Sequence, residues 1–145
     1  MEISIRNATT NDSPSITKLS SQLGYPSTYN SVKSRLAQLL KDAQNNCVFI
    51  ATNGDKLVGW IHGFYTLRIE SDPFVEIGGL VVDEKHQGIG VGRTLVEEVI
   101  DWARKLKSSH VRVRCNTKRK ESHQFYLTIG FTESKEQKIY DIRLD

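Results

Sequence analysis

Apolar positions along the chain change period several times, and each change predicts a new element. Near the N-terminus, Ile3 and Ile5 alternate with polar neighbours, which predicts a short strand. A spacing of three and four residues then predicts two amphipathic helices, the first capped by Ser13 and ended by Gly24. The apolar stripes of these two helices are formed by Ile16, Leu19, Leu23, Val32, Leu36, Leu39 and Leu40.

Three β-like runs follow the helices. The runs 47–52 and 57–65 are separated by Asn53-Gly54-Asp55, a turn signal that predicts an antiparallel hairpin. After a break at Ser71-Asp72-Pro73, the run 75–82 predicts the third strand of a meander. A glycine pair inside this third strand, Gly78-Gly79, indicates a bulge or a close approach of another backbone.

The last third of the chain adds two more helices and two more strands. A strongly amphipathic helix follows the third strand, and an alternating strand is predicted over Val111–Cys115. Ser122 to Ile129 predicts a short helix closed by Gly130, and Ile139–Leu144 predicts a last strand. The order β-α-α-β-β-β-α-β-α-β(β) is typical of a mixed α/β domain without internal repeats.

Composition narrows the class of protein. The chain has 145 residues, 38% hydrophobic and 26% charged, which predicts one domain over residues 1–145. No membrane-length apolar run and no signal-peptide pattern occurs, so we expect a cytoplasmic protein without a membrane partner. A net charge of +3 permits anionic ligands and does not indicate nucleic acid. Cys47 and Cys115 lie in apolar runs without metal-ligand spacing, which predicts reduced thiols and no metal site.

The third strand leads into a loop with glycine at three alternate positions, Gly88-Ile89-Gly90-Val91-Gly92, and the amphipathic helix begins there. Backbone N–H groups and the helix dipole at such a junction can hold a phosphate. The glycine spacing differs from the dinucleotide fingerprint GxGxxG, and the Gly-Lys-Ser/Thr of a Walker A loop is absent. We expect phosphate binding here; a purely structural turn is the alternative.

Two separated motifs resemble one family. Gln87–Gly92 is similar to the Q/R-x-x-G-x-G/A signature of the GNAT superfamily of acyl-CoA-dependent N-acetyltransferases. Asn116–Phe131 resembles the family pattern N-x-x-R…A-x-x-F-Y-x-x-x-G-F, with Ser122 where alanine is usual. The resemblance implies a central mixed, mostly antiparallel sheet of six to seven strands flanked by four helices. It also implies that a splayed pair of strands forms a slot for CoA, with Gly78-Gly79 at the point of splaying.

The resemblance further implies acetyl-CoA as cosubstrate. The pyrophosphate would rest on the glycine-rich loop and the start of its helix, and the pantetheine would run along the third strand of the meander. Asn116 would reach the pantetheine or the thioester, with a turn former as the alternative, and Arg119 would contact a phosphate, with a solvated surface residue as the alternative. The full set of expected cofactor-binding residues is Leu80, Val81, Val82, Gln87, Gly88, Ile89, Gly90, Val91, Gly92, Arg93, Asn116 and Arg119.

Tyr126 and Glu76 are the expected catalytic residues. In similar enzymes a tyrosine at the place of Tyr126 protonates the departing CoA thiolate; a half-buried packing residue is the alternative. Glu76 would take a proton from the amine through water. The alternatives are that a chain of water molecules takes this proton, or that Glu76 is simply an exposed residue of the strand.

The expected reaction is direct transfer of the acetyl group, in a ternary complex, to a primary amine of a small polar molecule. Such a molecule would be aminoalkylphosphonate-, aminoglycoside- or polyamine-like. A protein N-acetyltransferase acting on lysine or N-terminal amines, and a non-catalytic CoA-binding module, are the alternatives. Dimerisation is common in similar proteins, so a homodimer is a further expectation.

Overall fold

A five-stranded sheet organises the larger part of the chain. The computed structural model describes residues 2–145, which divide into two compact units, one running to Val113 and the other from Arg114 to Asp145. In the first unit the strand order follows the sequence, antiparallel from β1 to β4 and parallel between β4 and β5. The strands are β1 (Ile3–Asn7), β2 (Asn46–Asn53), β3 (Lys56–Thr66), β4 (Phe74–Val82) and β5 (Val111–Val113).

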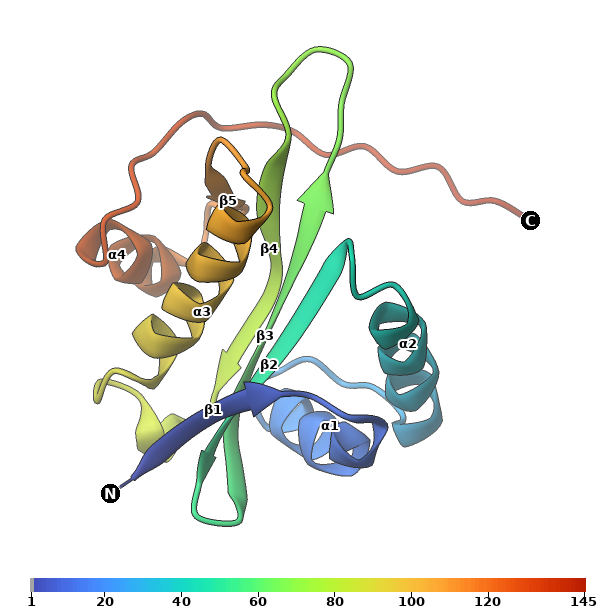
Figure 1. Ribbon diagram of the computed structural model, residues 1–145, viewed down its shortest axis with the longest axis vertical. Coiled ribbons are helices and arrows are strands. Elements are labelled where there is room, and N and C mark those ends of the chain that lie inside the picture. The colour runs from blue at the N-terminus through green and yellow to red at the C-terminus, as the bar shows by residue number, and fades with distance from the viewer. Residues whose placement is uncertain (1) are drawn as a thin grey trace. The chain divides into compact units, whose positions relative to one another are not determined.

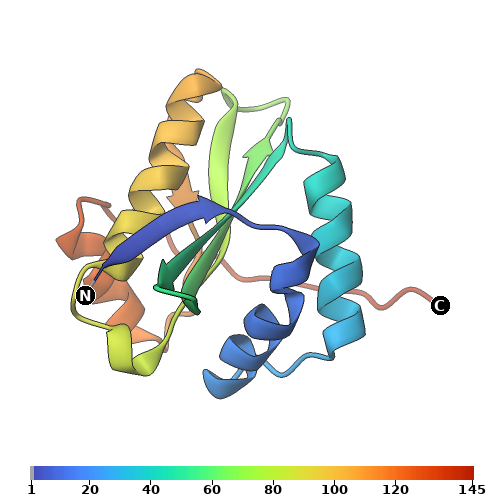
Figure 2. The same cartoon turned by 60° about the horizontal axis from the view of Figure 1, so that its bottom comes forward.

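Helices cover both faces of this sheet (Figures 1 and 2). Helix α1 (Ser13–Gln22) and helix α2 (Tyr29–Lys41) pack on one face, and α3 (Val91–Lys105) packs on the other. The predicted hairpin and meander are confirmed, with Gly54 at φ 61° in the β2–β3 turn. The mixed α/β class and the four helices are therefore confirmed as well, the fourth being α4 (Lys120–Thr128) in the second unit.

Two glycines of β3 let α3 lie directly against the sheet. A Cβ added at Gly59 would lie 3.1 Å from Leu95 Cδ1, and one added at Gly63 would lie 2.9 Å from Val99 Cγ1. A Cβ at Gly63 would displace its neighbour and one at Gly59 would make a contact tighter than most real ones, so the helix uses the space that these glycines leave. On the opposite face the core consists of Ala8, Ile16, Leu36, Val48 and Ile50.

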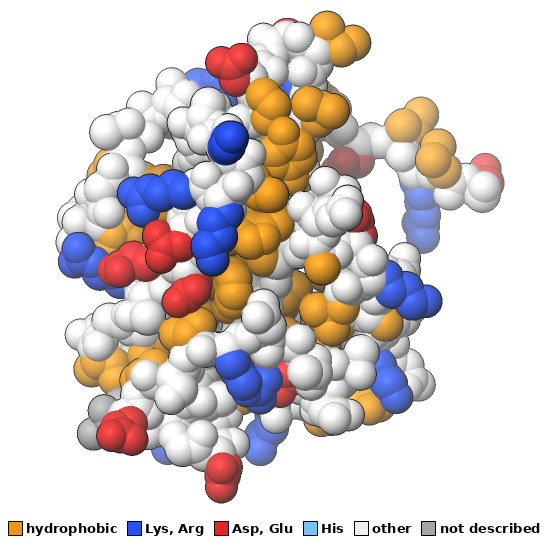
Figure 3. Space-filling view, viewed as in Figure 1, with side chains coloured by type: hydrophobic (Ala, Val, Ile, Leu, Met, Phe, Trp, Pro, Cys, Tyr) orange, Lys and Arg blue, Asp and Glu red, His pale blue; other side chains and the backbone are white. Residues whose placement is uncertain are grey.

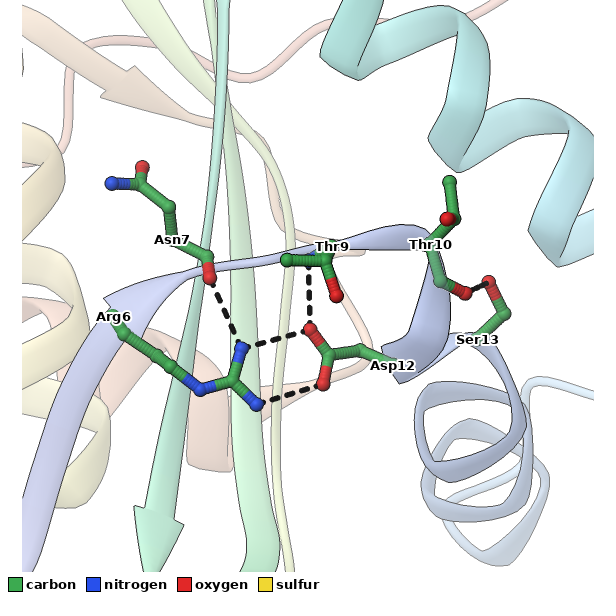
Figure 4. A network of polar contacts seen from close by, with 6 residues as sticks. All are labelled: Arg6, Asn7, Thr9, Thr10, Asp12 and Ser13. Atoms are coloured by element: carbon green, nitrogen blue, oxygen red, sulfur yellow. Dashed lines mark hydrogen bonds and ion pairs between the residues drawn. The ribbon is translucent and has the colours of Figure 1, made fainter.

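The entry into α1 differs from the prediction. A short 3-10 turn, η1 (Thr10–Asp12), precedes the helix, so Asp12 is the N-cap and Ser13 the first helical residue. Asp12 accepts hydrogen bonds from both terminal nitrogens of Arg6, at 2.9 and 3.0 Å, and from the Thr9 N–H at 2.8 Å (Figure 4). Burial alone disfavours its charge, but these donors prevail and hold the pKa of Asp12 below its ordinary value. The network ties the end of β1 to the start of α1.

The second unit contains α4 and an extended segment. Helix α4 is followed by Gly130 at φ +110°, as predicted. Residues 132–145 form neither helix nor strand, so the strand predicted over Ile139–Leu144 is wrong for this structure. A strand needs a neighbouring backbone to complete its hydrogen bonds, and this segment is in no ladder of the described chain. The sheet therefore has five strands rather than six to seven.

Candidate active site

The glycine-rich loop adopts the conformation that its glycines allow. It lies between a 3-10 turn, η2 (Glu84–His86), and α3. Gly88 and Gly90 have φ values of 80° and 95°, in the left-handed region, and Gly90 is the N-cap of α3. The first turn of α3 contains no acidic residue, and its leading N–H groups have no acceptor within the helix. The loop is thus suited to an anionic ligand. The dipole of α3 favours negative charge there, the leading N–H groups of the helix can donate hydrogen bonds, and no carboxylate of the first turn competes for them.

A buried Asp–His pair holds the base of this loop. His86 Nδ1 lies 2.7 Å from Asp83 Oδ2, and both residues are buried. The amide nitrogen of Asn53, on β2, lies 3.4 Å from His86 Nε2, and that of Gln22, on α1, lies 3.4 Å from Asp83 Oδ1. With Nε2 accepting from Asn53, the Nδ1–H donates to the carboxylate, and this bond holds the pKa of Asp83 below its ordinary value. The pair therefore links the loop to β2 and α1.

The predicted bulge in β4 is confirmed, and the β4–β5 ladder ends beside it. Across β3 and β4, His62 faces Gly79 and Gly63 faces Ile77, so Gly78 is the extra residue. The parallel ladder to β5 covers Val75 to Ile77 only. Beyond the bulge, therefore, the outer edge of β4 is unpaired by any described strand of the first unit.

In an antiparallel pair of strands, successive residues direct their N–H and C=O alternately toward and away from the partner strand. This alternation identifies which backbone groups of β4 point to the open edge. The Asp83 N–H donates to Val58 O at 2.8 Å, which makes these two residues a hydrogen-bonded pair. Alternate residues along β4 then direct their N–H and C=O away from β3, and these are Leu80 and Val82. Consistent with this, Val82 O accepts from Gln87 Nε2 at 3.1 Å. Val81 directs its backbone toward β3, and its side chain is buried.

Three aromatic side chains of β3 lie over the glycine pair, and sequence reasoning did not single them out. A Cβ at Gly78 would lie 2.9 Å from His62 Nδ1 and 3.1 Å from Phe64 Cε1, and one at Gly79 would lie 2.8 Å from Trp60. The sequence does contain a sign of this cluster, because aromatic residues at every second position of a strand lie on the same face of the sheet. Both glycines are therefore required by close approach of these rings.

His62 has a defined environment within this group. Its Nε2 lies 3.0 Å from Asn46 Oδ1, which leaves Nδ1 directed at Gly78. Burial lowers the pKa of His62 from its ordinary value, so the ring is neutral at neutral pH. Glu76 lies two residues before the bulge, opposite Phe64 on β3 and Arg112 on β5, and is half-buried.

The second unit holds the remaining predicted residues. Tyr126, on α4, contacts the rings of Phe125 and Phe131, with centroid distances of 5.0 and 5.4 Å. Burial raises the pKa of Tyr126 to about 12, and the nearby Cys115 thiol adds to the effect. Its hydroxyl therefore stays protonated throughout the physiological range.

Asn116 forms the turn that precedes α4. Its Oδ1 accepts from the Lys118 N–H at 2.9 Å, and its backbone O accepts from the Arg119 N–H at 3.0 Å. The same carbonyl lies 2.8 Å from His123 Nε2. Asn116 is thus a turn former in this structure, and Arg119 is the N-cap of α4.

The described residues offer neither a metal cluster nor a membrane span. Among residues 2–145, no group of three or more His, Cys, Asp or Glu side chains could hold a metal ion. Within the same part of the chain, no helix has both the length and the apolar character needed to cross a membrane.

Comparisons with known proteins agree with this architecture. Aminoglycoside N-acetyltransferase AAC(6')-Iy, in complex with CoA, has a TM-score of 0.88 at 18% identity, covering 99% of this chain and 96% of that one. Aminoglycoside antibiotic 6'-N-acetyltransferase AAC(6')-Ih from Acinetobacter baumannii has a TM-score of 0.87 at 15% identity, covering 99% and 100%. A transcriptional regulator from Bacillus halodurans has a TM-score of 0.86 at 23% identity, covering 97% and 100%. These likenesses define the class of fold.

Sequence comparison then defines the family. The model of the acetyltransferase (GNAT) family matches residues 17–131, which include the glycine-rich loop and Tyr126. No curated protein sequence matches the chain significantly. The chain belongs to the acetyltransferase (GNAT) family, the N-acetyltransferases that take their acetyl group from acetyl-CoA.

Proposed function

We propose that this protein transfers the acetyl group of acetyl-CoA directly to a primary amine of a small polar molecule, as a single domain over residues 1–145. The observation that carries the proposal is the open edge of β4, which begins at the Gly78 bulge and leads into the glycine-rich loop. One extended ligand could bind at both places, with an anionic end on the glycine-rich loop and an amide-containing arm along the open edge of β4. CoA has this chemistry.

The cosubstrate would bind mainly through backbone groups. Its pyrophosphate would accept from the N–H groups of the loop and of the first turn of α3, the segment from Gln87 to Arg93. Its pantetheine amides would pair with the C=O of Leu80 and the N–H of Val82, both of which point to the open edge. Val81 directs its backbone toward β3, so we leave it out of the residues proposed to bind CoA. Asn116 and Arg119 are proposed to contact the pantetheine and a phosphate from the second unit.

The acceptor would approach over the glycine pair. The rings of Trp60, His62 and Phe64 provide an apolar surface there, and Glu76 supplies a carboxylate nearby. A neutral His62 adds no positive charge that would repel an ammonium group. These features suit a primary ammonium on a small polar molecule, and the structural neighbours named as aminoglycoside N-acetyltransferases support this class of acceptor.

The reaction removes two protons from the ammonium group, one before attack and one as the amide forms, and it adds one proton to the thiolate. Glu76 would accept the ammonium proton through water, and the free amine would then attack the thioester carbon. A backbone N–H of β4, at Leu80, would stabilise the tetrahedral oxyanion before the carbon–sulfur bond breaks. A phenol with a pKa of about 12 is a weaker acid than a thiol, whose pKa is about 8.5. Tyr126 would therefore stabilise the leaving thiolate chiefly by donating a hydrogen bond, and the second amine proton, carried by solvent, would neutralise the thiolate.

Calorimetric titration and a thiol-release assay test this function. We expect acetyl-CoA to bind and an amine panel to reveal an acceptor whose acetylation releases free CoA. The variant Tyr126→Phe should lower kcat by roughly 10- to 100-fold with little change in the acetyl-CoA KM. Tyr140→Phe, a tyrosine of the extended segment, is the matched control and should retain full kcat. Lack of acetyl-CoA binding would refute the function, and an unchanged kcat in Tyr126→Phe would refute the role of Tyr126.

A further inference from the structure

The side-chain amide of Asn46, the first residue of β2, is held in one orientation by the end of α2. Its Nδ2 donates to the backbone carbonyl oxygen of Asp42 at 3.3 Å and to the carboxylate oxygen Oδ2 of the same residue at 3.4 Å. A carbonyl oxygen and an ionised carboxylate only accept hydrogen bonds, so the group of Asn46 that faces them is its NH2. The amide oxygen Oδ1 of Asn46 is thereby directed to His62.

This orientation determines which nitrogen of His62 carries the proton. Asn46 Oδ1 lies 3.0 Å from His62 Nε2, and because an amide oxygen has no hydrogen to donate, the Nε2–H is the donor. Burial lowers the pKa of His62, so the ring is neutral at neutral pH. A neutral imidazole has a single N–H, so Nδ1 keeps its lone pair and can accept a hydrogen bond.

The nitrogen Nδ1 is an accessible acceptor. His62 is half-buried, and no group in residues 2–145 donates to its Nδ1. Over the same residues, the side-chain atoms that are fully buried and lack a partner are Thr66 Oγ1 and Ser108 Oγ, and Nδ1 is not among them. An atom that has no partner and is not fully buried is open to water or to a small molecule.

This nitrogen lies where the acceptor is proposed to approach. A Cβ at Gly78 would lie 2.9 Å from Nδ1, and the ring of Phe64 lies beside the imidazole at a centroid distance of 5.5 Å. Glu76 is paired with Phe64 across β3 and β4, so Glu76, Phe64 and His62 point to the same face of the sheet. Figure 3 shows apolar side chains gathered over these two strands. A few polar atoms on such an apolar surface are what fixes the orientation of a small ligand.

From this geometry we propose that His62 is a further catalytic residue, whose Nδ1 takes the second proton of the acceptor amine. The inference rests on the proposed function. After Glu76 has received the first proton through water, the amine nitrogen bonds to the thioester carbon, whose carbonyl oxygen becomes the oxyanion. The nitrogen now carries a positive charge, and its proton passes to Nδ1. The carbonyl then re-forms as the carbon–sulfur bond breaks, and the imidazolium returns the proton through solvent to the thiolate. Asn46 is a positioning residue, because it acts through the His62 ring.

Nitrogen NMR of the histidine side chains tests the tautomer without any substrate. Protonated and unprotonated ring nitrogens have different chemical shifts, and comparison with His62→Gln identifies the signals of His62. We expect a protonated Nε2 and an unprotonated Nδ1 in the wild type at neutral pH. A proton on Nδ1 overturns the proposal.

The variant His62→Gln separates the chemical role from a structural one. Glutamine keeps an N–H donor that can reach Asn46, but it has no group that takes up a proton. We expect kcat to fall about 100-fold with whichever of aminoethylphosphonate, spermidine and kanamycin the wild type acetylates. The Kd of acetyl-CoA and the urea unfolding midpoint should stay unchanged. His110→Gln makes the same change at a histidine outside the site and should retain full kcat.

The variant Asn46→Asp tests the proton transfer through its pH dependence. A carboxylate beside Nε2 favours the imidazolium, so the acidic limb of the kcat profile should move to higher pH by about one unit. The other charged groups near His62 are Glu76 on β4 and Asp42 behind Asn46; Lys18, the charged residue of α1, is exposed. A purely structural role of His62 would leave this limb in place.

Two sets of results separate this role from the proposed function. If the wild type acetylates an amine but His62→Gln keeps its kcat, or the limb of Asn46→Asp does not move, the role of His62 is wrong and the function stands. If the wild type does not bind acetyl-CoA, or acetylates none of the three amines, the proposed function and this role are both overturned.

Discussion

Replacing His86 by phenylalanine tests whether the buried Asp83–His86 pair supports the glycine-rich loop. Phenylalanine preserves most of the ring volume but removes the 2.7 Å hydrogen bond to Asp83, which is 4% exposed. Removing the donor of a hydrogen bond to a buried charged group costs about 1.5 to 3 kcal/mol. The amide of Gln22 still reaches the carboxylate, and Lys56 still attracts it, so we expect a loss of stability of about 2 kcal/mol.

Urea unfolding and calorimetry measure the two consequences. A loss of about 2 kcal/mol lowers Tm by roughly 6 °C in a domain of this size. Because the pair anchors the loop, acetyl-CoA should also bind more weakly, by about 5- to 10-fold in Kd, for a loss of about 1 kcal/mol of preorganisation.

The double variant Asp83→Leu/His86→Phe is the decisive comparison. Removing both polar partners leaves no buried charge, so it should recover more than half of the lost stability. If His86→Phe is as stable as the wild type, or the double variant as unstable as the single one, the reasoning about this pair is refuted.

Two further predictions concern other parts of the fold. Gly79→Ala places a Cβ 2.8 Å from Trp60 and should cost about 1 to 3 kcal/mol in urea unfolding, whereas Gly54→Ala, with no atom within 4 Å, should cost about 1 kcal/mol through its positive φ alone. Equal costs would show that the Trp60 contact does not matter. The folded pKa values of Asp12 and Asp83 are lowered, so their stabilisation is present above the ordinary carboxyl pKa near 4 and is lost as pH falls through the folded values. When urea unfolding is measured between pH 2 and 7, the midpoint should decrease as the pH falls below 4. This decrease should be less steep in Asp12→Asn than in the wild type.

Local signals predicted most elements of the fold. The Asn53-Gly54-Asp55 turn and the Gly78 bulge are encoded by residues adjacent in sequence, and both appear where predicted. The first helix begins differently because Arg6 and Asp12 form a network that no local pattern indicates.

The parts that sequence reasoning missed depend on distant contacts. His62 meets Asn46 and Gly78 across neighbouring strands, and periodicity reports only that His62 faces one side of β3. The apolar pattern of Ile139–Leu144 predicts a strand, and the structure forms none there. Periodicity reports that a segment could be a strand, but it cannot show whether a neighbouring backbone is available to pair with it.

The seating of α3 on Gly59 and Gly63 has a consequence for ligand length. These glycines set the height of the helix above the sheet, and the N-terminus of that helix carries the anion loop. The distance from the loop to the bulge at Gly78 therefore depends both on β4, which joins them in the chain, and on the seating of α3 against β3. A thioester with a shorter arm would reach one of these two places and miss the other. The fold would thus select its acyl donor by span, and a side chain at Gly63 would change that span without entering the site.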